Sequence, residues 1–221
     1  MEQLTIVTLG TGGEDFLTRQ VENALRQAPQ LVLRTARHPM ALWLKQQNIP
    51  FDTVDDLYES CEDFDEFNAA VARRLAKRCG EGPVCYAVSD AAFDATVTAV
   101  RQLFAEKGAP VSLLPGVSHA SRCLALVEAP VSSVRLYAAA DFDRAPHSPE
   151  EPLLLSELHS AACAGDCKLK LMSLMPEDME LTFITGEEAT GELTASAIPL
   201  YELDRQKHYD HLTAVYVPGV P

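Results

Sequence analysis

The chain has 221 residues, 47% hydrophobic and 23% charged, which is typical of a globular protein and not of a disordered or fibrous one. Its formal net charge is −14, so nucleic acid and anionic membrane surfaces would be repelled. No apolar run reaches the roughly 18 residues of a membrane span, and the run from Leu4 to Leu9 is too short for a signal peptide. With no export signal, the six cysteines are expected to be reduced, and the protein to be cytoplasmic.

The first half of the chain alternates strand and helix signals. Short apolar runs bounded by turn residues predict a buried strand at residues 3–9 and further strands at residues 31–33, 84–88 and 111–114. Apolar residues at helical spacing predict helices at residues 16–28, 39–47, 63–78, 94–107 and 118–126. Residues 52–58 are expected to form only a short extended segment and a turn. This alternation predicts an α/β fold with a parallel sheet covered on both faces.

The pattern changes near Ala129-Pro130, which we take as the boundary between an N-terminal unit (1–129) and a C-terminal unit (130–221). Strands of a mixed sheet are expected at residues 134–139, 153–155, 181–185, 191–199 and 214–218. Two helices are expected, at residues 156–164 and 168–174, with Gly165 between them. The acidic, proline-rich residues 141–152 are expected to form a loop.

A cluster of glycines follows the first predicted strand, at Leu9-Gly10-Thr11-Gly12-Gly13. Glycines let the backbone approach a ligand closely at the carboxyl end of a strand, where open α/β sheets bind their ligands. The dinucleotide fingerprint requires a third glycine three residues after Gly12, and Asp15 stands there instead. An ordinary tight turn remains an alternative explanation of these glycines.

Two further predicted strands end in small or polar loops. Ser89-Asp90-Ala91-Ala92 follows one strand, and Pro115-Gly116-Val117-Ser118-His119 follows another. The Asp90 carboxylate can accept hydrogen bonds from ribose hydroxyls or an ammonium group, whereas helix capping explains Ser89, Asp90 or Ser118 without a ligand. Because the carboxyl ends of parallel strands share one edge, the three loops together indicate a ligand site there.

These elements resemble the tetrapyrrole methylase superfamily, which includes corrin and uroporphyrinogen methyltransferases and diphthine synthase. The resemblance rests first on the strand and glycine turn IVTLGTGG and on the Pro-Gly turn in LLPGVSHASRCLA. Three further stretches are similar to the branch that precedes MazG nucleotide pyrophosphohydrolase domains: LVLRTARHP, KLKLMSLMPEDMELTFIT and PLYELDRQKHYDHLTAVYVP. The resemblance extends from Gln3 to Pro218.

The resemblance implies two α/β lobes, usually dimeric, with S-adenosylmethionine bound in a cleft between them. Carried over position by position, it implies cofactor contacts in both lobes, at Gly10, Gly12, Gly13, Ser89, Asp90, Phe93, Ser118, His119, Ser156, Glu157, Gly186 and Leu212. Two loops depart from the family pattern. Gly10-Thr11-Gly12-Gly13-Glu14 replaces Gly-x-Gly-Pro-Gly, and Ser89-Asp90-Ala91 replaces Gly-Asp-Pro.

The first functional hypothesis is a methyltransferase that acts on a small-molecule acceptor. Arg34, Thr35 and His38 are the expected substrate contacts, and Arg34 with Arg37 could clamp carboxylates. Pairing with the chain's many acids is the alternative for both arginines. Methyl transfer depends mainly on alignment, so no catalytic triad and no metal are expected.

The second hypothesis is a non-catalytic module that binds S-adenosylmethionine and is associated with a MazG-type pyrophosphohydrolase. The residues end after the family's final strand, so no pyrophosphohydrolase activity is expected within them. A third hypothesis is a scaffold that only dimerises. His159, Cys163 and Cys167 share a helical face if the helix is continuous and would then be a weak zinc candidate, which Gly165 argues against.

Overall fold

The computed structural model describes residues 4–128, 133–187 and 190–220. Contacts divide the chain into two compact units, Met1–Ser118 and His119–Pro221. The boundary expected at Ala129-Pro130 lies outside the described residues, and the observed division comes earlier, at the start of helix α6 (His119–Leu126). Within the described ranges, the helices lack the length and apolar character that crossing a bilayer requires.

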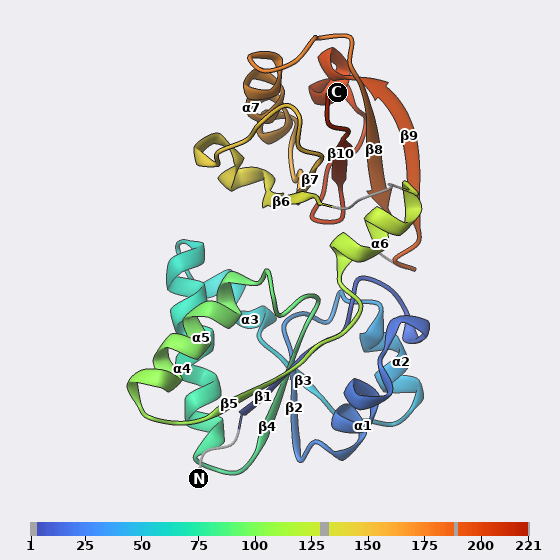
Figure 1. Cartoon of the computed structure of the whole chain (residues 1–221). Coiled ribbons are helices and arrows are strands. Elements are labelled where there is room, and N and C mark those ends of the chain that lie inside the picture. Colours follow the sequence, from blue (N-terminus) through green and yellow to red (C-terminus); the bar gives the residue numbers. More distant parts are fainter. Residues whose placement is uncertain (1–3, 129–132, 188–189, 221) are drawn as a thin grey trace. The chain divides into compact units, whose positions relative to one another are not determined.

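The N-terminal unit contains a parallel five-stranded sheet in the order β3-β2-β4-β1-β5. Its strands are β1 (Leu4–Thr8), β2 (Gln30–Leu33), β3 (Asp52–Thr53), β4 (Val84–Val88) and β5 (Val111–Leu114). Its helices are η1 (Glu14–Phe16), α1 (Arg19–Gln27), α2 (Met40–Gln46), α3 (Asp55–Ser60), α4 (Phe64–Cys79) and α5 (Ala95–Glu106). Helices α4 and α5 lie on one face and α1 and α2 on the other (Figure 1). The predicted parallel sheet is therefore confirmed.

Two apolar cores explain why this sheet is buried on both faces. Ile6, Tyr86 and Phe104 belong to the core beneath α4 and α5, whereas Val7 and Leu44 belong to the core beneath α1 and α2. Every residue of β4 is buried, as expected of a central parallel strand without polar alternation. The central strand is therefore covered on both faces, and its polar groups for a ligand can come only from the loops at its ends.

The C-terminal unit contains a mixed sheet in the order β6-β7-β10-β8-β9, in which only the β6–β7 pair is parallel. Its strands are β6 (Arg135–Ala138), β7 (Leu153–Ser156), β8 (Glu180–Gly186), β9 (Leu193–Pro199) and β10 (Ala214–Val217). Helix α7 (Ala161–Met172) and the short helices η2 (Ala139–Arg144) and η3 (Leu200–Arg205) pack on one face, and α6 packs on the other. The mixed sheet is confirmed.

Two predicted segments are wrong. The helices expected at residues 156–164 and 168–174 are one helix, α7, which begins after the N-cap Ser160 and includes Gly165. Ser156 is instead the last residue of β7. The short extended segment expected within residues 52–58 is confirmed as β3, but helix α3 begins at Asp55 in place of the expected turn. Most other residues of α7 are alanine, leucine, lysine or methionine, which are good helix formers, so one glycine does not end the helix.

Replacing Gly165 with alanine is expected to stabilise the protein by about 0.5–1 kcal/mol, because alanine is the better residue inside a helix. A Cβ at this position would lie 3.9 Å from the nearest atoms, the Cβ and Oδ2 of Asp204, which is ordinary contact. Urea unfolding followed by circular dichroism measures the change. A loss of stability in Gly165→Ala would show that α7 and η3 pack too closely for a methyl group.

Candidate functional site

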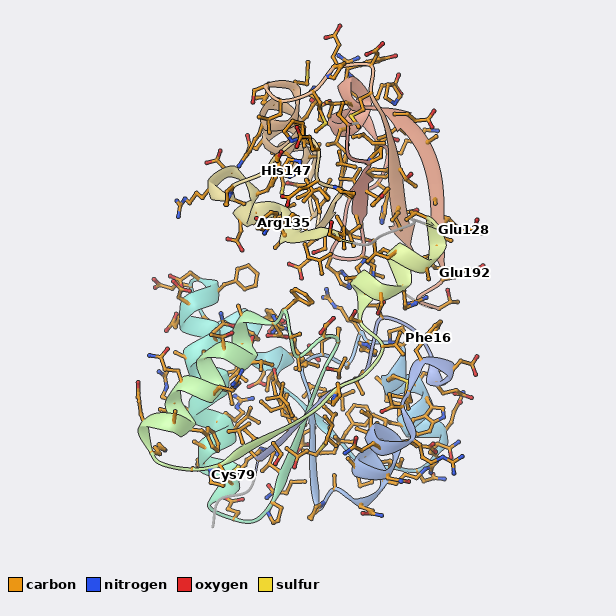
Figure 2. The ribbon with its side chains drawn as sticks, in the orientation of Figure 1. Phe16, Cys79, Glu128, Arg135, His147 and Glu192 are labelled. Carbon is orange, nitrogen blue, oxygen red and sulfur yellow. The ribbon has the colours of Figure 1, made fainter. Side chains whose placement is uncertain are left out.

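The turn after β1 places backbone against two neighbouring loops. Gly10 has φ +78°, and a Cβ there would lie 3.0 Å from the carbonyl oxygen of Val117 and 3.6 Å from Cβ of Phe16, labelled in Figure 2. The Gly10 N–H donates to the carbonyl of Ser89 at 2.9 Å. Gly10 is therefore required for this close approach and is more than an ordinary turn residue. No described atom lies within 4 Å of a Cβ built on Gly13, so the turn is open on that side.

The loop after β4 is fixed to β1 and is not a helix cap. The Ala91 N–H donates to the Thr8 hydroxyl at 3.1 Å, and the Ala92 N–H donates to Oδ1 of Asp90 at 3.1 Å. The cap of α5 is Asp94, whose carboxylate accepts the first N–H groups of that helix, so the capping alternative for Ser89 and Asp90 is wrong. Phe93 is 56% exposed in this loop.

The loop after β5 passes very close to β1. A Cβ on Gly116 would lie 2.4 Å from the carbonyl oxygen of Thr8, so only glycine fits there. The hydroxyl of Thr18, which also caps α1, donates to the carbonyl of Pro115 at 3.5 Å. Ser118 ends the N-terminal unit, directly before α6. The predicted convergence of these three loops is thus seen within one unit.

The residues after β2 hold this edge together. Nδ1 of His38 accepts the Met40 N–H at 3.1 Å, so its Nε2 carries the proton and donates to the Gly10 carbonyl at 2.7 Å. Arg34 forms an ion pair with Asp94 at 2.7 Å, as expected from the alternative in which the arginine pairs with one of the chain's acids. The Thr35 hydroxyl accepts the backbone N–H of Arg37 at 3.2 Å, and Arg37 is exposed. Arg34 and His38 therefore bind protein groups, Asp94 and the Gly10 carbonyl.

The predicted residues of the C-terminal unit also lie near one another. A Cβ on Gly186 would lie 2.8 Å from Cβ of Leu212. The turn before β10 is held by Asp210, whose carboxylate accepts the Leu212 N–H at 2.8 Å and the Thr213 hydroxyl at 2.9 Å.

A residue with strained backbone follows β7. Glu157 has φ +60°, which is uncommon for a residue other than glycine. The next residue, Leu158, donates its N–H to the Thr213 carbonyl at 3.0 Å and so joins Glu157 to the turn before β10. Ser156 lies at the end of β7, and its hydroxyl donates to the Tyr137 carbonyl at 3.5 Å. Such strain is a reason to test Glu157, since it persists only where surrounding contacts hold it.

His119 is buried at the start of α6. Its Nε2 lies 3.5 Å from Sγ of Cys123. Burial and the nearby Arg122 guanidinium lower the pKa of His119 to about 4, although a hydrogen bond to the backbone of Leu212 opposes this. The imidazole is therefore neutral near neutral pH.

The lowered pKa of His119 predicts a loss of stability in acid. Between about pH 6.5 and pH 4 the unfolded state binds more protons than the folded state, so stability falls as the pH falls. We expect this group to cost about 2 kcal/mol between pH 7 and pH 5. Between pH 7 and pH 5, the free energy of unfolding measured in urea should fall by about 2 kcal/mol less in His119→Gln than in the wild type. Equal pH dependence in the two proteins would contradict the assignment.

The three residues of the weak zinc candidate do not share a helical face, because His159 precedes Ser160, the N-cap of α7. In residues 4–128, 133–187 and 190–220, no three histidine, cysteine or acidic side chains are grouped in a way that could hold a metal ion.

Sequence reasoning missed Thr8 and Asp94 as contributors to the site. Thr8 is a buried polar residue at the end of an apolar strand, and that is a usable signal. Asp94 opens a predicted helix, which signals a cap but does not reveal its second partner, Arg34.

Comparison with known proteins agrees with this geometry. The family described as Tetrapyrrole (Corrin/Porphyrin) Methylases matches residues 3–174. The chain is 27% identical over 221 residues to "Uncharacterized protein YabN" of Bacillus subtilis (strain 168), covering 99% of this chain and 45% of that protein. It therefore spans less than half the length of this relative.

Solved structures have the same fold. Uroporphyrin-III-C-methyltransferase from Thermus thermophilus has a TM-score of 0.76 at 17% identity, with 99% of this chain and 95% of that chain covered. Cobalt precorrin-4 methyltransferase has a TM-score of 0.72 at 15% identity, with 98% and 95% covered. Since the family match covers most of the residues, the chain belongs to the tetrapyrrole (corrin/porphyrin) methylase family.

Proposed function

We propose that this protein binds S-adenosylmethionine at the carboxyl edge of its N-terminal sheet and transfers the methyl group to a small-molecule acceptor. One observation carries the proposal: the loops after β1, β4 and β5 meet through Gly10, whose N–H binds the Ser89 carbonyl and whose Cα lies against Val117. Family membership supports the choice of donor and of reaction class.

The residues present fit such a ligand. Gly10 and Gly116 leave no side chain between the loops, and Gly13 is open on the side where a Cβ would lie. The Asp90 carboxylate accepts the Ala92 N–H through Oδ1, and a carboxylate can accept several hydrogen bonds, for example from ribose hydroxyls. In the C-terminal unit, we propose that Ser156, Glu157, Gly186 and Leu212 contribute to adenine binding, and that His119 contacts the cofactor together with Ser118. Gly12, Ser89, Phe93 and Ser118 complete the proposed cofactor contacts.

The donor supplies an electrophilic methyl group on a sulfonium. Bound at these loops, the donor would offer this methyl group to a nucleophilic atom of the acceptor, with its own sulfur as the leaving group. The protein's task is alignment, which supplies much of the rate enhancement in a displacement of this kind. Thr35 and Arg37 are the remaining candidates after β2 for contact with the acceptor. The charge of −14 disfavours an acceptor with several carboxylates.

A second candidate function is a non-catalytic module that binds S-adenosylmethionine and is associated with a MazG-type pyrophosphohydrolase. Two observations favour it: the Ser89-Asp90-Ala91 loop, in place of the family's Gly-Asp-Pro, and the greater length of the YabN relative. We further propose that the protein is cytoplasmic and that it forms a homodimer. Sedimentation velocity tests the dimer.

Calorimetry with S-adenosylmethionine and S-adenosylhomocysteine separates these proposals when combined with an assay of labelled methyl transfer. Binding of both ligands with turnover on an acceptor supports the enzyme. Binding of both ligands without turnover across a panel of small acceptors supports the module. Absence of binding by the folded protein contradicts both and favours a scaffold.

A further inference from the structure

Arg34 and Asp94 form a nearly buried ion pair that joins the end of β2 to the start of α5. Nη1 of Arg34 lies 2.7 and 2.8 Å from the two carboxylate oxygens of Asp94 and also donates to the Thr96 hydroxyl. The side chains are 23% and 10% exposed. Oδ1 of Asp94 also accepts the backbone N–H groups of Thr96 and Val97, at 2.7 and 3.2 Å. One carboxylate therefore caps α5 and binds the guanidinium.

The pair is held firmly by its surroundings. The guanidinium carbon lies 5.5 Å from the centre of the Phe67 ring, and the Thr96 hydroxyl donates to Oδ1 of Asn68 at 2.6 Å. Burial alone would lower the pKa of Arg34, but the Asp94 carboxylate raises it, so the charge is retained. The arrangement leaves the Arg34 guanidinium little freedom to leave Asp94 for a substrate.

The pair sits at one end of the loop that contains Asp90. At the other end, the Ser89 carbonyl accepts the Gly10 N–H, and the Ala91 N–H binds the Thr8 hydroxyl. The Arg34 backbone N–H donates to the carbonyl of Ala87, in β4, at 2.9 Å. Arg34 thus connects the strand before the loop with the helix cap after it, so that residues 89–93 are fixed at both ends.

We propose that Arg34 and Asp94 are positioning residues that hold residues 89–93 in the conformation that presents Asp90 to the methyl donor. The expected effect on donor binding rests on the proposed function, whereas the expected effect on the conformation of residues 89–93 does not. The competing explanation is an ion pair that stabilises the N-terminal unit in general.

The test compares three variants with the wild-type protein. Arg34→Met removes the guanidinium, and Arg34→Lys keeps a charge but loses the planar guanidinium that lies over the Phe67 ring. Arg74→Met is the matched control, because Arg74 binds both oxygens of Asp56 at 2.6 and 2.7 Å in the same unit without contacting this loop. The readouts are amide hydrogen exchange of the unliganded protein, S-adenosylhomocysteine affinity by calorimetry, and the melting temperature.

Exchange in residues 89–93 should be about ten-fold faster in Arg34→Met and affinity about ten-fold weaker, with a smaller effect in Arg34→Lys and none in Arg74→Met. Wild-type exchange in this segment, or faster exchange spread evenly over the unit, would overturn the proposal. If Arg34→Met does not fold, Asp94→Asn, which keeps a capping oxygen, replaces it with the same expectations. If the wild-type protein binds no donor, the proposed function fails, and the exchange comparison still decides the role of the pair.

Discussion

Gly116→Ala is expected to destabilise the protein by about 3 kcal/mol or more, because the new Cβ would overlap a backbone atom. That Cβ would lie 2.4 Å from the Thr8 carbonyl oxygen and 3.0 Å from Cγ2 of the same residue. Thr8 is 4% exposed at the end of β1, so it cannot move aside without disturbing the sheet. Circular dichroism during urea unfolding measures the loss.

Gly13→Ala is the matched control for stability. Gly13 lies in the same set of loops with φ −77°, and no described atom is within 4 Å of its would-be Cβ. We expect its stability to remain within about 0.5 kcal/mol of the wild type. If Gly116→Ala were as stable as Gly13→Ala, the close approach of the β5 loop to β1 would be refuted.

Asp90→Ala is expected to weaken S-adenosylmethionine binding by about 10- to 100-fold, since hydrogen bonds to a charged acceptor are worth roughly 1.5–3 kcal/mol. Asp90→Ala also removes the oxygen that accepts the Ala92 N–H, so the melting temperature is recorded beside the affinity. Calorimetry with both S-adenosylmethionine and S-adenosylhomocysteine provides the measurement.

Asp90→Asn separates the carboxylate from the turn, because asparagine keeps an oxygen for the Ala92 N–H. Its affinity should lie between those of the wild type and Asp90→Ala. If both variants bind like the wild type at an unchanged melting temperature, Asp90 does not contact the donor.

The strands of the N-terminal sheet could be predicted because their signals are local. The bounds expected for β4 and β5 agree with the structure to the residue. Short runs of mainly apolar residues between turn residues define such strands without reference to the rest of the chain. The sharing of one sheet edge by their loops then follows from parallel topology.

Tertiary contacts decided what the sequence could not show. Gly165 remains inside α7, where the helix packs against Asp204 of η3. Arg34 and Asp94 are 60 positions apart, so no spacing rule links them. Arg34, which was expected to contact a substrate, therefore binds Asp94, a partner that only the fold brings close to it.

A crystal structure of the protein with S-adenosylhomocysteine tests the central claim most directly. The claim predicts ligand density against the backbone of Gly10 and the Pro115–Ser118 loop, with a ligand hydroxyl or ammonium within hydrogen-bond distance of the Asp90 carboxylate. Density on another surface, or a ligand that touches only one of these loops, would contradict it.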